Sequence, residues 1–269
     1  MRFLSSLGED FRALWSVRRL VGVLTRREFE ARHAGSAGGI VWAWIPPLLT
    51  LLTYFLVFDV VFAMRLGENA PTNRVGAYLV VGMLPWMAFA DAAQRGMGSL
   101  LEAGGMLQKN PLPPAIFPAR SVLASTLVFS PLLLVLVFVY VQSHQFSPGL
   151  FAVLPLYALQ LLMCFLLAYL LAVLAAALRD VVQVVGFLLS IGLFLSPVLF
   201  PVTMFPEGWR WVLWLNPMSA FVMGYQAALL QGAWPEAQVW GVIGVWIGLL
   251  AIALNMVLSR SRDQLVDWL

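Results

Sequence analysis

The sequence predicts an all-α integral membrane protein with six transmembrane helices, an N-terminal amphipathic interfacial helix and a short re-entrant helix pair between spans five and six. Composition is the first reason. Hydrophobic residues make up 61% of the chain and charged residues 11%, with a mean hydropathy of +0.88. Soluble domains carry about 25% charged residues, so a soluble protein is excluded. The second reason is that the apolar residues gather into runs long enough to cross a bilayer.

Residues 1–41 are expected to form a cytoplasmic interfacial helix and a hinge. Arg12, Arg19 and Arg26 are spaced by seven and line one side of a helix whose other side is apolar. Such a helix lies in the headgroup layer, and the glycines after Arg32 let the chain bend into the first span. A basic anchor that only fixes the topology would also explain the arginines. The segment lacks the continuous apolar core of a secretory signal, so we expect it to be retained.

Six apolar runs have roughly the 20 residues that a helix needs to cross a hydrocarbon core of about 30 Å. They cover residues 42–64, 76–99, 119–141, 150–178, 182–200 and 237–258. Pro197 and Pro201 interrupt the end of the fifth run. Together the runs define a transmembrane domain at 42–258, which a tail at 259–269 follows.

Basic residues are distributed unequally between the connecting segments. With the N-terminus inside the cell, thirteen arginines and lysines lie on the cytoplasmic side and three, Arg65, Arg74 and Arg210, lie outside. Positive charges favour the cytoplasmic side of a membrane. Because six spans place both ends of the chain on one side, both termini are expected in the cytoplasm.

Residues 201–235 are apolar and aromatic, but Pro206, Gly208 and Asn216-Pro217 divide them. The pieces have about ten and fifteen residues, too few to span a bilayer. Two short helices that enter the outer leaflet and return are expected, provided that protein shelters their broken backbone. A cap lying flat on the lipid is the alternative.

Some polar and aromatic residues are candidates for lining a channel or its exit gate. The aromatic ones could be interface residues or a stacking surface for a sugar, and the sequence does not separate these two roles. Two carboxylates near the ends of the first and second runs could face a polar channel or reach toward the interface. The candidates are Trp42, Trp44, Asp59, Asp91, Trp209, Trp214, Asn216 and Tyr225.

The sequence holds no pattern for catalysis or metal binding. Cys164 is the only cysteine, which excludes an intrachain disulfide and a Cys/His metal cluster. A phosphate-binding loop ends in Gly-Lys-Ser/Thr. The only lysine, Lys109, follows Gln108 and precedes Asn110. We therefore expect no catalytic residue, no metal and no cofactor on this chain, and ATP hydrolysis would need a separate subunit.

Several stretches occur in a specific order. They are "ARHAGSAGGIVWAWIPP" before the first span, "GMLPWMAFADAAQRGMGSLLEAGGMLQKNPLPPAIFP" across the second span and its loop, "LRDV" and "LSPVLFP" around the fifth span, and "WLNPMSAFVMGYQAALL" after it. This order, over nearly the whole chain, resembles the permease subunits of type-2 ATP-binding-cassette exporters that move O-antigen, capsular polysaccharide or teichoic acid. The resemblance implies a bacterial inner-membrane subunit that exports a lipid-linked polysaccharide.

The resemblance also assigns a role to the cytoplasmic loop 101–118. In the resembling family this loop forms a coupling helix that docks on a separate ATPase. Here a short helix stopped by Asn110-Pro111 is expected, because proline disfavours the helical region for the residue before it. Its contact residues would be Glu102, Met106, Leu107, Gln108 and Lys109, with Met106 and Leu107 filling the partner's pocket. A plain loop with one helical turn is the alternative.

A single six-helix bundle has too little wall for a lumen as wide as a glycan, so a homodimer with its two-fold axis along the pore is expected. The resemblance implies two ATPase copies carrying ATP and Mg, with Arg12, Arg19, Arg26 and Arg32 at the cytoplasmic entrance. The other expected partners are the lipid-linked glycan and membrane lipids, with no nucleic acid. Two further functions stay open: a related permease for a drug, antibiotic or lipid, and a membrane enzyme or scaffold, which the lack of a catalytic pattern disfavours.

Overall fold

A computed structural model describes residues 5–32, 34–66, 71–109, 112–144, 147–261 and 265–268, and every regular element in these ranges is helical. The α-helices are α1 (Ser5–Ser16), α2 (Arg18–Ala31), α3 (Ile45–Phe55), α4 (Val75–Leu107), α5 (Ile116–His144), α6 (Val153–Ala177), α7 (Val181–Phe194), α8 (Trp211–Trp214), α9 (Pro217–Leu230), α10 (Ala237–Ser261) and α11 (Leu265–Trp268). The tighter 3-10 turns are η2 (Gly39–Ala43), η4 (Pro148–Ala152), η5 (Val202–Met204) and η6 (Glu207–Trp209), and η3 (Leu56–Val61) is a wider π turn. The all-α class is therefore confirmed.

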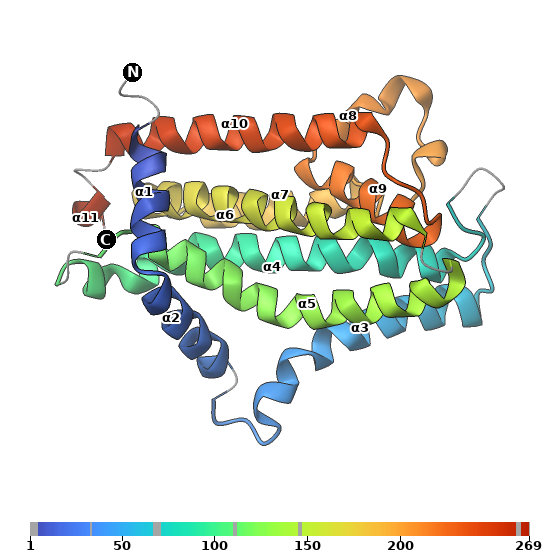
Figure 1. Cartoon of the computed structure of the whole chain (residues 1–269), viewed down its shortest axis with the longest axis horizontal. Helices are drawn as coiled ribbons and strands as arrows, with labels where there is room; N and C mark the ends of the chain where they lie inside the picture. The colour runs from blue at the N-terminus through green and yellow to red at the C-terminus, as the bar shows by residue number, and fades with distance from the viewer. Residues whose placement is uncertain are drawn as a thin grey trace.

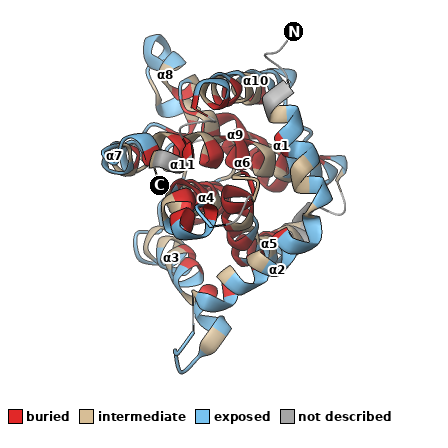
Figure 2. Ribbon diagram, turned by 90° about the vertical axis from the view of Figure 1, so that its left-hand side faces the viewer, coloured by how far each residue is buried: buried red, intermediate tan, exposed pale blue. Residues whose placement is uncertain are grey.

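The bundle is organised around α4 (Figures 1 and 2). This helix packs against α5, α6 and α9, and it also contacts α3 and α7, whose other sides are exposed. Gly96 of α4 faces Ala168 of α6 so closely that a methyl group added at Gly96 would clash with the Ala168 Cβ. The glycine therefore allows the two central helices to approach each other, as small residues do at helix interfaces in membranes.

Four helical segments are long and apolar enough to cross a membrane, by length and composition, in the part of the chain that the structure describes. They are Val75–Leu107, Ile116–Tyr140, Pro148–Ala177 and Ala237–Ser261. These segments match the second, third, fourth and sixth predicted spans. The first and fifth predicted spans correspond to shorter apolar helices, Ile45–Val61 and Val181–Phe194.

The fifth predicted span, 182–200, is too long. Helix α7 has 14 residues and is about 21 Å in length, below the hydrocarbon thickness of about 30 Å. It ends at Phe194, because a proline at position 197 restricts the residue before it to extended backbone. The first predicted span, 42–64, is also divided, into the 3-10 turn η2, the helix α3 and the π turn η3.

The N-terminal amphipathic segment forms two helices where one was expected. The chain turns at Val17, so that α1 and α2 meet at an elbow. Figure 1 shows α1 lying across the ends of the long bundle helices, nearly perpendicular to them. Helix α1 contacts α10 and α2 contacts α5, so the segment covers one end of the bundle.

The expected re-entrant pair is not found as two comparable helices. The first piece contains only the turns η5 and η6 and the single helical turn α8. The second piece is α9, which is buried along most of its length against α4, α6 and α10. A cap lying flat on lipid does not describe α9, because protein encloses it on most sides.

Candidate functional site

Five charged side chains join the C-terminal part of α2 to the middle of α4 and the start of α5. We call them the charged cluster: Glu28, Arg32, Asp91, Arg95 and Arg120. Glu28 pairs with Arg32 Nη2 at 2.8 Å and with Arg120 Nε at 3.1 Å. Asp91 pairs with Arg95 Nε at 2.7 Å. The Arg32 side chain is 9% exposed and also lies 3.7 Å from Asp91, so it connects the two carboxylates.

Two serines of α5 complete the charged cluster. The Ser121 hydroxyl donates to Glu28 at 3.1 Å, and the Ser125 hydroxyl donates to Asp91. Arg32 also donates to the Ser121 carbonyl oxygen at 3.4 Å. Both carboxylates therefore accept hydrogen bonds from hydroxyl groups and from guanidinium groups.

The four arginines predicted at the cytoplasmic entrance therefore divide into two kinds. Arg32 lies inside the charged cluster, whereas Arg12, Arg19 and Arg26 are exposed. Arg26 forms an exposed pair with Glu30 at 2.7 Å. The hydrogen bond and negative charge of Glu30 raise the pKa of Arg26 above its ordinary value, so this arginine stays charged.

The expected coupling residues lie at the C-terminal end of α4, about 15 residues beyond Asp91, and do not form a helix of their own. Glu102, Met106 and Leu107 form the last turns of α4, which continues directly from the second span. Met106 is 42% exposed, and Gln108 and Lys109 are exposed in the turn that follows. Leu107 is 7% exposed and belongs to the hydrophobic core of the chain, and its contact with a partner stays a prediction. The expected stop at Asn110-Pro111 lies outside the described residues.

Near the opposite end, Asp59 accepts a hydrogen bond from the Gly76 backbone N–H at 2.9 Å. The carboxylate therefore ties the π turn η3 to the first turn of α4, where the helix dipole favours a negative charge. Asp91 lies 15 residues further along α4 than Gly76, about 22 Å away along the helix. The two aspartates thus occupy separate places along the bundle, and a role for either in lining a channel stays a prediction.

The aromatic candidates also lie in different surroundings. Trp209 and Trp42 are exposed, while Trp214 is half-buried and its carbonyl oxygen accepts from Trp246 Nε1 at 3.1 Å. Trp44 packs against Phe29 of α2, with ring centroids 6.1 Å apart, and so connects the interfacial segment to the first span. These positions do not converge on one surface of the chain.

Asn216 and Tyr225 hold the inserted helix α9 in place. Asn216 caps α9 by accepting from the Met218 N–H at 3.0 Å, and its amide donates to the Gly192 carbonyl oxygen of α7 at 2.7 Å. Tyr225 is fully buried and donates to Gln160 Oε1 at 2.8 Å. Tyr225 is therefore a core residue of the single chain, and its role at an exit gate stays a prediction.

Sequence reasoning missed a set of buried neutral groups that we call the neutral cluster: Tyr78, Gln160, Tyr225 and Gln226. Gln160 donates to the Pro85 carbonyl oxygen at 2.9 Å. Tyr78 and Gln226 both donate to the carbonyl oxygen of Pro197, at 2.6 and 2.9 Å, where the chain breaks after α7. The glutamine at position 160, within the apolar run of α6, could have indicated this cluster, because polar side chains inside a membrane span usually have a structural or functional role.

Comparison with known proteins places these features in a family. Residues 19–230 match the family described as ABC-2 type transporter. The chain is 32% identical over 261 residues to an O-antigen export system permease protein, RfbA of Myxococcus xanthus, covering 95% of this chain and 97% of the relative. It is 25% identical to RfbA of Klebsiella pneumoniae over 79% of this chain and 81% of that protein. It is 22% identical to the polysialic acid transport protein KpsM of Escherichia coli, over 91% of this chain and 93% of that protein.

The family match covers most of the chain, and these relatives align over 79% to 95% of it. The described part of the chain holds four helices of membrane-spanning length. The resemblance read from the sequence is therefore confirmed. The chain belongs to the ABC-2 type transporter family and is a multi-pass membrane permease.

Proposed function

We propose that this chain is the membrane subunit of an exporter that moves a lipid-linked polysaccharide, such as O-antigen or capsular polysaccharide, across the bacterial inner membrane. The observation that carries this proposal is the 32% identity to an O-antigen export permease along almost the entire chain. A polysialic acid transport protein aligns over 91% of the chain as well. Permeases for a drug, antibiotic or lipid are the alternative, and none of these relatives carries such a name.

The proposed topology has six spans with both termini in the cytoplasm. The unequal distribution of arginines supports this orientation. It places the charged cluster, the interfacial helices and the exposed end of α4 on the cytoplasmic side. Ile45–Val61 and Val181–Phe194 are the two short spans in this topology. A short span is tolerated where the bilayer thins or where a second subunit covers it.

A homodimer is the proposed functional unit. Within one chain, α7 buries only Val185, and large apolar side chains including Phe187, Leu188 and Phe194 are exposed along it. In Figure 2, α3 and α7 lie on the same side of the bundle and both present exposed residues. If two copies of the chain associate through this side, both short spans are covered and the translocation path lies between the subunits.

A separate ATPase subunit, present in two copies and holding ATP and Mg, is the proposed energy source. The tip formed by Met106, Gln108 and Lys109 is exposed at the end of the central helix. Because α4 packs against five other helices, a displacement of its tip by a bound partner would be transmitted to those helices without a flexible connection. Exposure of this tip, in the absence of any phosphate-binding loop in the sequence, supports docking of such a partner.

The test is transport in proteoliposomes that contain this chain, its cognate ATPase and a lipid-linked glycan on the outer leaflet. We expect glycan to move into the lumen only with hydrolysable ATP. ATP-driven movement of a hydrophobic dye without glycan movement would support the small-molecule alternative, and glycan movement that ignores ATP would overturn the exporter proposal.

A further inference from the structure

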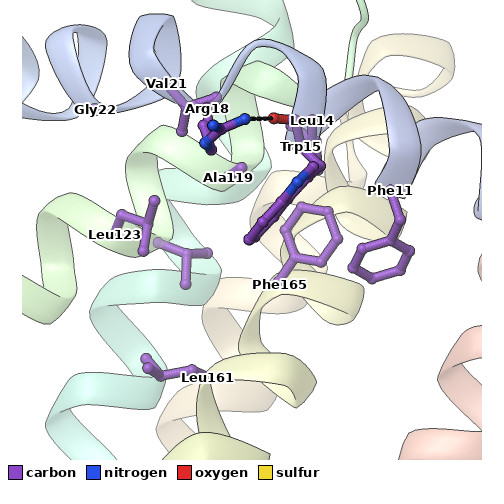
Figure 3. A pocket seen from close by; sticks show the side chains of 11 residues that line it. Phe11, Leu14, Trp15, Arg18, Val21, Gly22, Ala119, Leu123, Leu161 and Phe165 are labelled. Carbon is purple, nitrogen blue, oxygen red and sulfur yellow. Dashed lines mark hydrogen bonds between the residues drawn. The ribbon is translucent and has the colours of Figure 1, made fainter.

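A cavity of about 370 Å³ lies under the elbow between α1 and α2 (Figure 3). Its walls are Leu14 and Val21 from the interfacial helices, Leu123 from α5, and Leu161 and Phe165 from α6. Apart from Arg18, every residue that lines it is apolar. Its volume falls within the range of about 300–1,000 Å³ that is typical of small-molecule sites. Such a lining favours a hydrocarbon chain over water, which needs polar partners.

One cationic group marks the cavity. The Arg18 guanidinium lies 5.3 Å from the centre of the Trp15 ring, and its Nη1 donates to the Trp15 carbonyl oxygen at 3.1 Å. Arg18 is exposed and, within the described part of the chain, pairs with no carboxylate. Its remaining donors are therefore free to meet an anion at the headgroup level.

Trp15 lies beside this cation and is 73% exposed in the isolated chain. Figure 3 shows its indole extending from the elbow toward Phe165, with Arg18 above it. Tryptophan places an apolar ring in the acyl region and its N–H among headgroups. The elbow thus combines an apolar cavity, which suits an acyl chain, with a cation, which suits a phosphate. The interface aromatic Trp15 lies beside this cation.

We propose that this cavity binds one anionic phospholipid of the leaflet in which α1 and α2 lie, with an acyl chain between α5 and α6 and the phosphate on Arg18. Charge complementarity supports this occupant, because Arg18 is exposed and lines the cavity and a basic residue near an anionic surface contributes about 1 kcal/mol. The bound lipid would fix the angle of the elbow against the bundle. This inference depends on the interfacial placement of α1 and α2, and it holds whichever substrate is exported.

Gly22 provides a way to block the cavity without disturbing the core. It lines the cavity, and a Cβ placed there meets no atom within 4 Å. Because Gly22 lines the cavity and has open space around it, we expect a leucine at this position to compete with the acyl chain. Gly241 of α10 also has open space around it and does not line the cavity, so Gly241→Leu is the matched control.

The experiment is native mass spectrometry of the purified full chain, titrated with phosphatidylglycerol or phosphatidylcholine of identical acyl chains. The wild type is expected to retain one phosphatidylglycerol with about fivefold preference over phosphatidylcholine. Arg18→Gln is expected to remove the preference, whereas Arg19→Gln is expected to preserve it. Gly22→Leu is expected to lower the occupancy of both lipids, and Gly241→Leu is expected to change neither.

Three results would overturn the proposal. Equal loss of preference in Arg18→Gln and Arg19→Gln would show diffuse attraction in place of a site. Unchanged occupancy in Gly22→Leu, with gel filtration showing a folded protein, would show that the cavity holds no acyl chain. Displacement of phosphatidylglycerol by equimolar polyprenyl phosphate would assign the cavity to a substrate lipid.

Discussion

The helices are connected by different kinds of polar interaction in the two halves of the bundle. Next to α2, the charged cluster joins three helices through carboxylates and guanidinium groups, and the Arg95 side chain remains 47% exposed. In the other half, the neutral cluster satisfies the carbonyl oxygens of Pro85 and Pro197 with amides and hydroxyls that are almost fully buried.

The difference follows from the surroundings of each joint. Charges cost too much in hydrocarbon, so they gather where water and headgroups are near. A broken backbone inside the bundle instead needs neutral donors, because an unpaired carbonyl oxygen in an apolar setting also costs free energy. The polar interactions of this protein therefore differ with their surroundings. Ion pairs attach the interfacial helix α2 to the bundle, and neutral hydrogen-bonding groups stabilise the non-helical segment after α7 and the helix α9.

The largest expected effect comes from removing the centre of the charged cluster. Glu28→Gln leaves Arg32 and Arg120 without their shared carboxylate, so we expect a loss of about 2 kcal/mol in stability. Thermal unfolding in detergent, followed by gel filtration, measures it. Glu30→Gln on the same helix is the control, because its pair with Arg26 is exposed and contributes about 0.5 kcal/mol at most. Equal losses from the two variants would contradict the ordering.

A smaller effect is expected in the neutral cluster. Gln160→Met removes the partner of both Tyr225 and the Pro85 carbonyl oxygen and is expected to cost about 1 kcal/mol. Tyr225→Phe removes one of these hydrogen bonds from the other side. If the pair interacts as the structure shows, the double variant loses less than the sum of the single variants, and strict additivity would contradict the contact.

Asn216 is expected to show an effect no larger than that of Gln160, and its variants separate two roles. Asn216→Ala loses both the cap of α9 and the bond to α7, at a cost of about 1 kcal/mol. Asn216→Ser keeps an oxygen that can cap α9 but has no amide to reach Gly192, so its loss is expected to be smaller. Thermal unfolding of the two variants side by side checks this order, and an equal loss would assign the whole effect to the bond with α7.

The helices themselves could be predicted from the sequence, because a long apolar run in a bilayer must satisfy its backbone hydrogen bonds internally, and a helix does so. Where α4 ends could not be predicted. The polar residues around Glu102 suggested a separate helix, but Ala103 and Leu107, one turn apart, are buried and keep α4 continuous. Packing of this kind depends on distant parts of the chain, which local composition does not show.

The candidate site was predicted less well than the fold, and for a similar reason. The pair Glu28 and Arg32 has the helical spacing of four that predicts an ion pair. The contacts of Glu28 to Arg120 and Ser121 cross about ninety residues of chain and have no local signal. Tyr225 was predicted at a surface because aromatic residues look alike in an interface and in a core, and only its bond to Gln160 distinguishes the two.

The tip of α4 is the proposed docking site of the ATPase. The most direct measurement is co-purification of the cognate ATPase with tagged Met106→Glu and Lys109→Glu variants in nanodiscs. Met204→Glu is the matched control, because Met204 is 58% exposed, compared with 42% for Met106, and lies in the segment between α7 and α10. We expect the ATPase to be lost from the two α4 variants and retained by the wild type and the control. Retention by all three variants would contradict docking at this tip.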